Sequence, residues 1–242
     1  MPLPVAVVGA ASAAASASAY RVAGVGISRP AMAAASLALA LALVLPRRIW
    51  RWARLGVTAV HESGHAMVAL LVGRKVTAIH LRPDSSGVTI HYGPGGWLRR
   101  MMTAGAGYPA PGLLGLVGAW LVEHHQLQLW LVVLLVLGVV NVVVWIRNAF
   151  GLLVMTAWVV GFVWLIARGT AGIDALVGAV AVWLLVLGGL RAAMELPRAP
   201  APSDAADMGR LVHLPSGLFK AGFVLAGGAA VVAVAGLLSA TW

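Results

Sequence analysis

Two histidines and a glutamate form the most reactive pattern in this sequence. Residues 61–65 read His-Glu-Ser-Gly-His, inside a largely apolar run over residues 55–72. On a helix, His61 and His65 lie one above the other on the same face, so both imidazoles can bind one zinc ion. Glu62 is then placed to act as a general base. The motif predicts a zinc-dependent hydrolytic centre. The alternative, a solvated helix face, is disfavoured by the apolar surroundings.

The composition of the chain predicts a protein with several membrane spans. Hydrophobic residues make up 61% of the chain and charged residues 10%, whereas about 25% of a soluble domain is charged. A helix needs about 20 mostly apolar residues to cross a bilayer. The segments that reach or approach this length are residues 31–45, 55–72, 104–122, 127–146, 149–167, 171–190 and 217–240. The first is short and the last is rich in glycine, so we expect an all-α polytopic membrane protein with six or seven transmembrane helices.

The net charge of +10 does not indicate a nucleic-acid-binding protein. Lys and Arg lie between the apolar runs, with no dense basic stripe interleaved with aromatic residues. With seven spans, twelve of the 17 basic residues fall on one side of the membrane. The positive-inside rule makes that side cytoplasmic. The five on the other side include Arg47, Arg48, Arg51 and Arg54, which precede the motif helix and weaken the assignment.

The two ends of the chain differ in character. Residues 1–20 form an Ala- and Ser-rich tract with no basic residue ahead of its apolar part, which favours a flexible tail over residues 1–30 rather than a cleaved leader. Residues 31–242 then form one integral-membrane domain. The chain has no cysteine, which excludes disulfides and thiolate metal sites. The preference for Arg, Ala, Gly and Val suggests a bacterial genome rich in GC, and hence a bacterial plasma membrane.

A β-hairpin is predicted directly after the motif helix. Gly73 suits the end of that helix. Residues 76–81 and 87–92 are β-prone runs that flank a turn rich in Pro, Asp, Ser and Gly, so residues 76–92 are expected to form a hairpin. Within a membrane its open edges must be paired, covered by protein or exposed to water. Two interpretations stay open: a simple interfacial hairpin, or an edge that pairs with an extended substrate segment.

Together these segments resemble the site-2-protease-like intramembrane zinc metalloproteases, most closely the compact branch of B-type membrane peptidases. The resemblance is carried by the zinc motif, by Gly73, by the hairpin with its Pro-Asp and Gly-Val-Thr runs, and by the Ala-Gly-Tyr-Pro run at residues 106–109. It is close over residues 57–121. It implies a catalytic core of membrane helices, a membrane-associated β-hairpin, one Zn²⁺ per chain, and cleavage of transmembrane protein substrates in the lipid bilayer.

The third zinc ligand is the part of this resemblance that the sequence does not supply directly. In that family it is an aspartate in a Leu-Asp-Gly motif, which this chain lacks, although Asn141 and Asn148 resemble the approach to it. A catalytic zinc usually has three protein ligands and a water. Among the few carboxylates, Asp204 is the favoured ligand, with Asp207 and Asp174 as alternatives. Asp204 is also suited to cap the N-terminus of a helix.

The remaining ionisable residues near the predicted site have ordinary interpretations. His80 and His91 lie in the predicted hairpin, where surface histidines are common, although either can face a metal-lined cavity. His124 and His125, beside Glu123, are expected at a membrane border rather than at a second metal.

The predicted function is hydrolysis of peptide bonds in transmembrane substrates. His61, His65 and a carboxylate hold zinc, and Glu62 takes a proton from the attacking water. The substrate helix must unwind locally, because a helix encloses its own carbonyls. One alternative is a catalytically inactive, zinc-binding membrane scaffold. Another is an ion transporter, for which internal repeats would be evidence; none is visible in the sequence.

Overall fold

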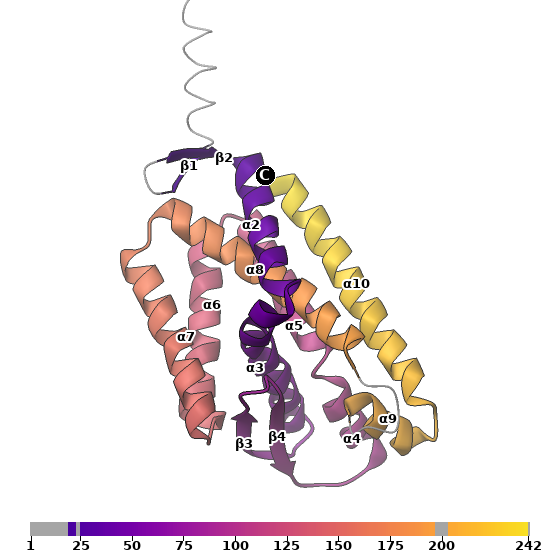
Figure 1. The fold of residues 1–242 in the computed structure, drawn as a ribbon. Helices are drawn as coiled ribbons and strands as arrows, with labels where there is room; N and C mark the ends of the chain where they lie inside the picture. Colours follow the sequence, from indigo (N-terminus) through magenta and orange to yellow (C-terminus); the bar gives the residue numbers. More distant parts are fainter. Residues whose placement is uncertain (1–18, 23–24, 197–202, 242) are drawn as a thin grey trace, which may run out of the picture.

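The computed structural model describes residues 19–22, 25–196 and 203–241, and these are mostly helical (Figure 1). In chain order the elements are β1 (Ala19–Val22), β2 (Val25–Ser28), α2 (Arg29–Val44), α3 (Arg47–Leu71), β3 (Lys75–Leu81), β4 (Gly87–Tyr92), α4 (Trp97–Gly105), α5 (Pro109–Glu123), α6 (Leu127–Val140), the π-helical turn η1 (Asn141–Trp145), α7 (Ala149–Arg168), α8 (Ala171–Met194), α9 (Asp204–Val212) and α10 (Ser216–Thr241).

Four helical segments are long and apolar enough to cross a membrane: α6 continued by η1, α7, α8 and α10. The pair α2 and α3, bent by 103°, and the pair α4 and α5, bent by 55°, each meet the same criterion when taken together. The described helices therefore give four to six spans and fit a polytopic membrane protein. The count of seven exceeds this range, because it treated residues 31–45 and 55–72 as two separate crossings, whereas the chain turns sharply between them.

The N-terminal tail expected over residues 1–30 ends earlier than predicted. Strands β1 and β2 pair antiparallel, with Tyr20 opposite Ile27. Helix α2 starts at Arg29, and the Ser28 side chain caps it by accepting a hydrogen bond from the Ala31 amide at 3.4 Å. Within the span of that expected tail, residues 19–22 and 25–28 form paired strands and residue 29 begins a capped helix. Residues 1–18, including most of the Ala- and Ser-rich tract, lie outside the described residues.

The long helices form a bundle in whose core glycines of one helix pack against large side chains of the next. Trp130 of α6 and Val182 and Val186 of α8 are fully buried. A Cβ added at Gly178 would lie 2.6 Å from Leu127 Cδ1, and one added at Gly115 would lie 2.6 Å from Val186 Cγ1. Glycine at these contacts lets the backbones of membrane helices approach closely. The packing fixes α8 beside α5 and α6, and the end of α8 then reaches the motif helix.

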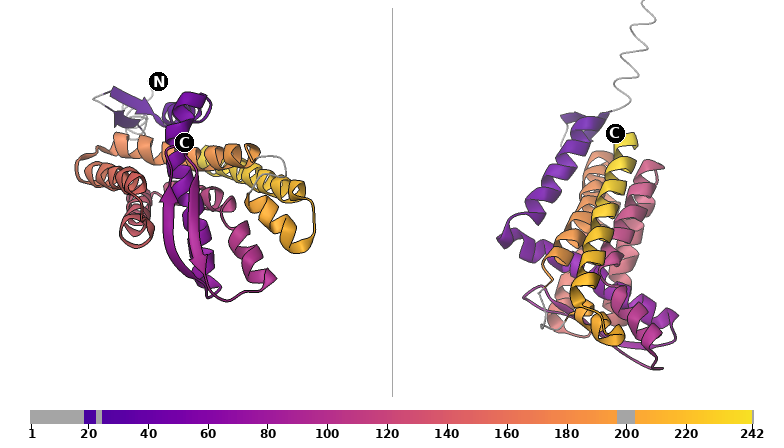
Figure 2. Two further views of the ribbon diagram at one scale, coloured as in Figure 1. Left: turned by 60° about the horizontal axis from the view of Figure 1, so that its bottom comes forward. Right: turned by 90° about the vertical axis from the view of Figure 1, so that its right-hand side faces the viewer.

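Strands β3 and β4, helices α4 and α9, and the motif helix α3 gather at one end of this bundle, away from β1, β2 and the C-terminus (Figures 1 and 2). The predicted hairpin is present: β3 and β4 pair antiparallel with Ile79 opposite Thr89, and a bulge lies between Val76 and Ala78. The free edge of β3 is covered by the chain that joins η1 to α7, since Ile79 bridges to Ile146. Among the described residues no strand pairs with the other edge of β4.

Two of the predicted spans start or break differently from expectation. The span predicted over residues 104–122 is divided into α4 and α5 at residues 106–108, where Pro109 lacks the backbone N–H that a continuous helix needs. The motif helix, predicted over residues 55–72, begins eight residues earlier at Arg47. Its added turns expose Arg47, Arg48 and Arg51. The polar stretch before the last span contains a further short helix, α9.

Candidate metal centre

Helix α3 presents both histidines of the motif on one face. His61 Nε2 and His65 Nε2 lie 3.0 Å apart, and both side chains are largely buried. This face of α3 packs on the break between α4 and α5: a Cβ added at Gly64 would lie 2.9 Å from the Ala106 carbonyl oxygen. The glycine in the middle of the motif therefore lets the broken backbone come close to the histidines.

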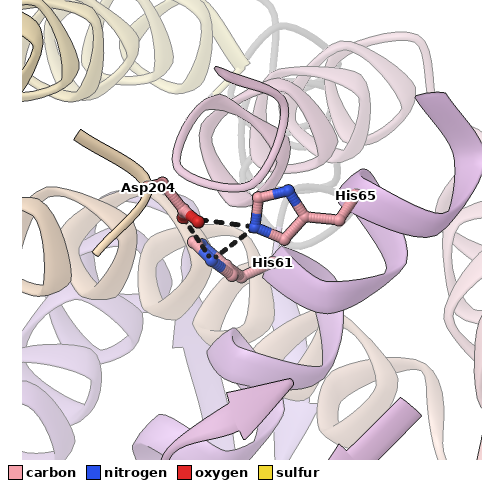
Figure 3. A group of neighbouring side chains, drawn as sticks. All are labelled: His61, His65 and Asp204. Carbon is pink, nitrogen blue, oxygen red and sulfur yellow. Dashed lines mark hydrogen bonds and ion pairs between the residues drawn. The ribbon is translucent and has the colours of Figure 1, made fainter. Parts of the chain in front are cut away.

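Asp204 approaches the same point from α9. Its Oδ2 lies 3.2 Å from His61 Nε2 and 3.2 Å from His65 Nε2. Figure 3 shows the three side chains turned towards one another. Asp204 is the first residue of α9 and does not cap the helix, because the Ser203 side chain accepts the Ala206 N–H at 3.2 Å. With the capping position filled by serine, the Asp204 carboxylate points towards α3.

The charge states of these groups suit metal ligands. Burial opposes ionisation of Asp204, but hydrogen bonds from His61 and His65 outweigh it and hold the pKa of this carboxyl well below its usual range. The His65 Nδ1–H donates to the Thr103 carbonyl oxygen at 2.7 Å. Without a metal the His65 Nε2–H donates to Asp204; loss of that proton would leave a lone pair on Nε2, the atom that faces Asp204 and His61, while the bond to Thr103 stays in place. The His61 ring stands edge-on to Tyr108, with ring centres 4.6 Å apart.

The three groups fit a zinc ion. With bonds of about 2.0–2.1 Å, a tetrahedral ion separates its ligand atoms by about 3.4 Å, close to the 3.0–3.2 Å found between the two Nε2 atoms and Oδ2. Two imidazoles and one carboxylate are also a ligand set of catalytic zinc sites. Backbone closes one side: a Cβ added at Gly107 would lie 2.5 Å from His61 Cε1 and closer still to His65 Nε2. Glycine at position 107 thus leaves the space that the imidazoles occupy.

The alternative carboxylates do not join the histidines. Asp207 forms an exposed ion pair with Arg210. Asp174 lies in the first turn of α8, where its Oδ2 accepts a hydrogen bond from Gln128 at 3.1 Å. Gly189, which lines the cavity beside the histidines, is 15 residues further along the same helix, a rise of roughly 22 Å. The structure therefore brings only Asp204, of the three candidates, to the histidines.

Glu62 is held by the hairpin. It is buried, and its Oε2 accepts a hydrogen bond from the Thr89 hydroxyl at 2.7 Å. A Cβ added at Gly87 would lie 2.6 Å from Glu62 Oε1, so β4 touches the carboxylate directly. Sequence reasoning did not assign a role to Thr89. Its spacing of two from Gly87 on a predicted strand, which places both on one face, was the available signal.

A family model described as Peptidase M50B-like matches residues 34–235 of the chain. The chain belongs to this family. The resemblance to the compact branch of membrane peptidases is thereby confirmed, and membership identifies a membrane metallopeptidase. The match includes the motif histidines, Glu62 and Asp204. No curated protein and no solved structure matches the chain.

In this M50B-like peptidase the two asparagines that resemble the approach to the third ligand have positioning contacts. Asn141, fully buried in η1, donates through Nδ2 to the Ser63 hydroxyl at 2.9 Å. Asn148 donates to the Leu81 carbonyl oxygen at 2.7 Å and accepts the Leu81 N–H at 3.1 Å. One asparagine thus holds the motif helix, and the other holds β3 as a neighbouring strand would.

A cavity of about 930 Å³ opens beside the three candidate ligands of the M50B-like peptidase. Its walls come from α3, the tip of the hairpin and β4, α4, the end of α8, and α9. His91 lies on its wall, as do Arg74 and Arg100. His124, by contrast, is exposed at the end of α5 and bonds to the Trp120 carbonyl oxygen at 2.8 Å, in line with the ordinary role predicted for it. The cavity is large enough for a short extended peptide.

Proposed function

We propose that this chain is an intramembrane zinc metalloprotease that hydrolyses peptide bonds of transmembrane proteins. The observation that carries the proposal is the convergence of His61 Nε2, His65 Nε2 and Asp204 Oδ2 within 3.2 Å of one another, next to a buried Glu62 in a cavity. We assign the activity to a single integral-membrane domain, residues 31–242, in a bacterial plasma membrane. Membership of a metallopeptidase family supports this assignment.

The proposed ligands are His61, His65 and Asp204, with one zinc ion per chain. When bound, zinc supplies Lewis-acid chemistry: it polarises a carbonyl and makes a water molecule acidic enough to lose a proton near neutral pH. The Thr103 carbonyl keeps the His65 ring in one tautomer and one orientation. A hydrogen bond to the outer nitrogen of a ligating histidine tunes both the affinity of a metal site and its reactivity.

Glu62 is the proposed general base. Its carboxylate accepts the proton of the attacking water and then delivers it to the nitrogen of the leaving amine. The Thr89 hydroxyl and the close contact with Gly87 keep the carboxylate beside the candidate ligands rather than free to rotate. A base fixed in this way loses little conformational freedom when the reaction begins.

The substrate is proposed to bind as an extended strand. A helical segment encloses its own carbonyls, so it must unwind before hydrolysis. The edge of β4 that faces away from β3 lies on the cavity, where Ser86, Gly87, Val88 and Thr89 form part of the wall. Strand addition at such an edge supplies backbone hydrogen bonds to an unwound segment and carries it past Glu62.

Replacing the base tests the proposal. Wild-type protein in detergent is incubated with single-span reporter proteins and with quenched-fluorescence peptides taken from their spans, and products are identified by mass spectrometry. Glu62→Gln should lower kcat by at least about 100-fold, with zinc content unchanged. Glu123→Gln, the same change at the far end of α5, is the matched control and should cleave normally. Equal cleavage by wild type and Glu62→Gln would contradict the mechanism, and zinc without any cleavage would favour the inactive scaffold.

A further inference from the structure

Arg74 has an unusual environment within the catalytic cavity. It follows Gly73 at the end of α3, and its backbone N–H donates to the Ala69 carbonyl oxygen at 2.8 Å, which fixes the start of its side chain. Its Nε and Nη1 are both enclosed, and neither has a hydrogen-bond partner among the described residues. The Nδ1 of His91 is likewise enclosed and unpartnered within the part of the chain that the structure describes. Both side chains line the same cavity as His65.

Such donors indicate a missing acceptor. Enclosing two nitrogens of a charged guanidinium without hydrogen-bond partners costs free energy, and most buried polar groups in folded proteins have partners; Arg74 Nη2 is not among the enclosed atoms and remains open to the cavity. The carboxylates of the cavity are engaged elsewhere: Glu62 with Thr89, Asp204 with the histidines. Asp207 pairs with Arg210. Since the described side chains supply no anion to Arg74, an anion that pairs with it has to come from a bound molecule.

The place of this subsite follows from the register of β4. Gly87, Thr89 and His91 alternate along the strand and so share one face. Gly87 and Thr89 contact Glu62, and His91 pairs with Val76, next to the start of β3 and hence near Arg74. Two residues of strand span about 7 Å. The unpartnered donors therefore lie about two residues along the strand from the proposed general base.

We propose that Arg74, with His91, forms an anion subsite that binds a side-chain carboxylate of the substrate about two residues from the cleaved bond. The inference rests on the proposed function and deepens it, because it names a substrate class: membrane segments with an Asp or Glu close to the scissile bond. A guanidinium binds a carboxylate through two parallel hydrogen bonds and is selective for it over an amide. An extended segment along β4 directs every second side chain to the face that carries His91.

The test uses amidated dodecapeptides of one transmembrane-like sequence, in which one position at a time carries Asp, Asn or Lys. Full-length protein in neutral detergent should cleave the Asp peptide about tenfold faster than the Asn peptide, in kcat/KM, at one position two or three residues from the cleaved bond. In Arg74→Gln the ratio of Asp to Asn should fall to about one, and Arg74→Glu should prefer Lys at that position. Arg82→Gln, an exposed change in the hairpin turn, is the matched control and should keep the preference.

A binding measurement keeps the inference separate from the proposed function. Fluorescence anisotropy of the same peptides on zinc-loaded Glu62→Gln protein should show tighter binding of the Asp peptide, again dependent on Arg74. If wild type cleaves in a Glu62-dependent way with no preference for Asp in rate or binding, this inference fails and the proposed function stands. If cleavage does not depend on Glu62 while Asp-selective binding persists, the proposed function fails instead.

Two further experiments distinguish a substrate side chain from two other sources of an anion, the C-terminus of a peptide and a lipid phosphate. Peptides with a free C-terminus replace the amidated ones; a preference that needs this terminal carboxylate would overturn the assignment to a side chain. Micelles containing phosphatidylglycerol replace the neutral detergent; an Arg74-dependent gain in rate that ignores the peptide's charge would assign the donors to a lipid phosphate and also overturn it. A preference for Asp that survives in Arg74→Gln would remove Arg74 from the subsite.

Discussion

Asp204 and Asp207 lie on the same short helix, three residues apart, and yet their environments differ. Asp204 is turned towards two imidazoles at 3.2 Å, whereas Asp207 is paired with Arg210 in an exposed position. Ser203 makes this difference possible, because it caps α9 and leaves the carboxylate of Asp204 free. The pair offers a comparison in which the chemistry of the side chain is constant and only its direction changes.

We expect substitution of Asp204 to weaken zinc binding and the same substitution of Asp207 to leave it unchanged. Asp204→Asn removes an anionic ligand and should weaken zinc affinity by at least about 100-fold, so the purified variant should hold far less than one zinc per chain. Asp207→Asn should bind zinc like the wild type. Metal content after dialysis against a chelator, measured by plasma mass spectrometry, checks both. Full zinc retention by Asp204→Asn would remove Asp204 from the proposed ligand set.

The two histidines and Glu62 could be predicted from the sequence, because their arrangement depends only on their spacing along one helix. The spacing of four between His61 and His65 places them on one helix face whatever the tertiary structure. Asp204 was favoured by the chemistry of its carboxylate and by its place ahead of the last span. Its contact with His65, 139 residues away in sequence, could not be predicted, because it depends on packing that no local pattern encodes. Thr89 and Gly107 were not assigned roles for the same reason: each acts through a neighbour that is distant in sequence.

The hairpin shows how one element positions another. Among the residues that the structure describes, no strand lies on the outer side of β3, and the chain between η1 and α7 takes that place through Ile146 and Asn148. The Asn148 amide satisfies both backbone groups of Leu81, as a neighbouring strand would. β4 pairs with β3 and holds Glu62 through Thr89. The hydrogen bonds of Asn148 to β3 therefore help to fix the position of the proposed base.

Loosening the hairpin should therefore reduce cleavage without releasing zinc. Asn148→Ala removes two hydrogen bonds, each contributing about 0.5–1.5 kcal/mol, and should lower kcat/KM about tenfold. Asn148→Asp can still accept the Leu81 N–H but cannot donate to its carbonyl oxygen, so its loss should be of similar size. Asn148→Gln keeps both the amide donor and the carbonyl acceptor, so it should retain more activity than Asn148→Ala or Asn148→Asp. Unchanged cleavage by Asn148→Ala would show that the hairpin does not depend on this attachment, and zinc content serves as the control for folding.

Hydropathy predicted where the helices lie in the sequence but not where the chain breaks or bends between them. The spans at residues 127–146, 149–167 and 171–190 match α6 with η1, α7 and α8 closely, since long apolar runs have few other stable forms in a bilayer. Residues 104–122 were predicted as one span because a window average does not register a break near Pro109. The prediction of six or seven spans meets the four to six of the described helices at six, and the seventh arose because the bend of 103° between α2 and α3 leaves the hydropathy of both segments unchanged.

Seen as a whole, the molecule has one strongly basic end. After the bend that follows α2, helix α3 runs towards the end that holds the hairpin, α4 and α9 (Figure 1). The elements at this end and their immediate flanks carry Arg74, Lys75, Arg82, Arg99, Arg100 and Arg210, and Arg147 is joined to β3 through the Ile79 carbonyl oxygen; β1 and the start of α2, at the opposite end, carry Arg21 and Arg29. The positive-inside rule now predicts that the catalytic end faces the cytoplasm.

Accessibility of introduced cysteines tests this orientation, because the chain has none of its own. Gly95, between β4 and α4, has nothing within 4 Å of an added Cβ, and Gln126 is exposed between α5 and α6. In intact cells a membrane-impermeant maleimide should label Gln126→Cys, and it should label Gly95→Cys only after permeabilisation. The reverse pattern would place the catalytic end outside the cytoplasm.

The position of α9 near the end of the chain also has a consequence in time. Ribosomes add about 5–20 residues per second, so the 139 residues from His65 to Asp204 take roughly 7–28 s to synthesise. During that interval the growing chain already contains both histidines, Glu62 and the hairpin, but only two of the three proposed ligands. On this ligand set a partly made chain cannot hold zinc in a catalytic arrangement. We therefore expect the proposed protease to leave the membrane proteins inserted beside it intact until its last helices are in place.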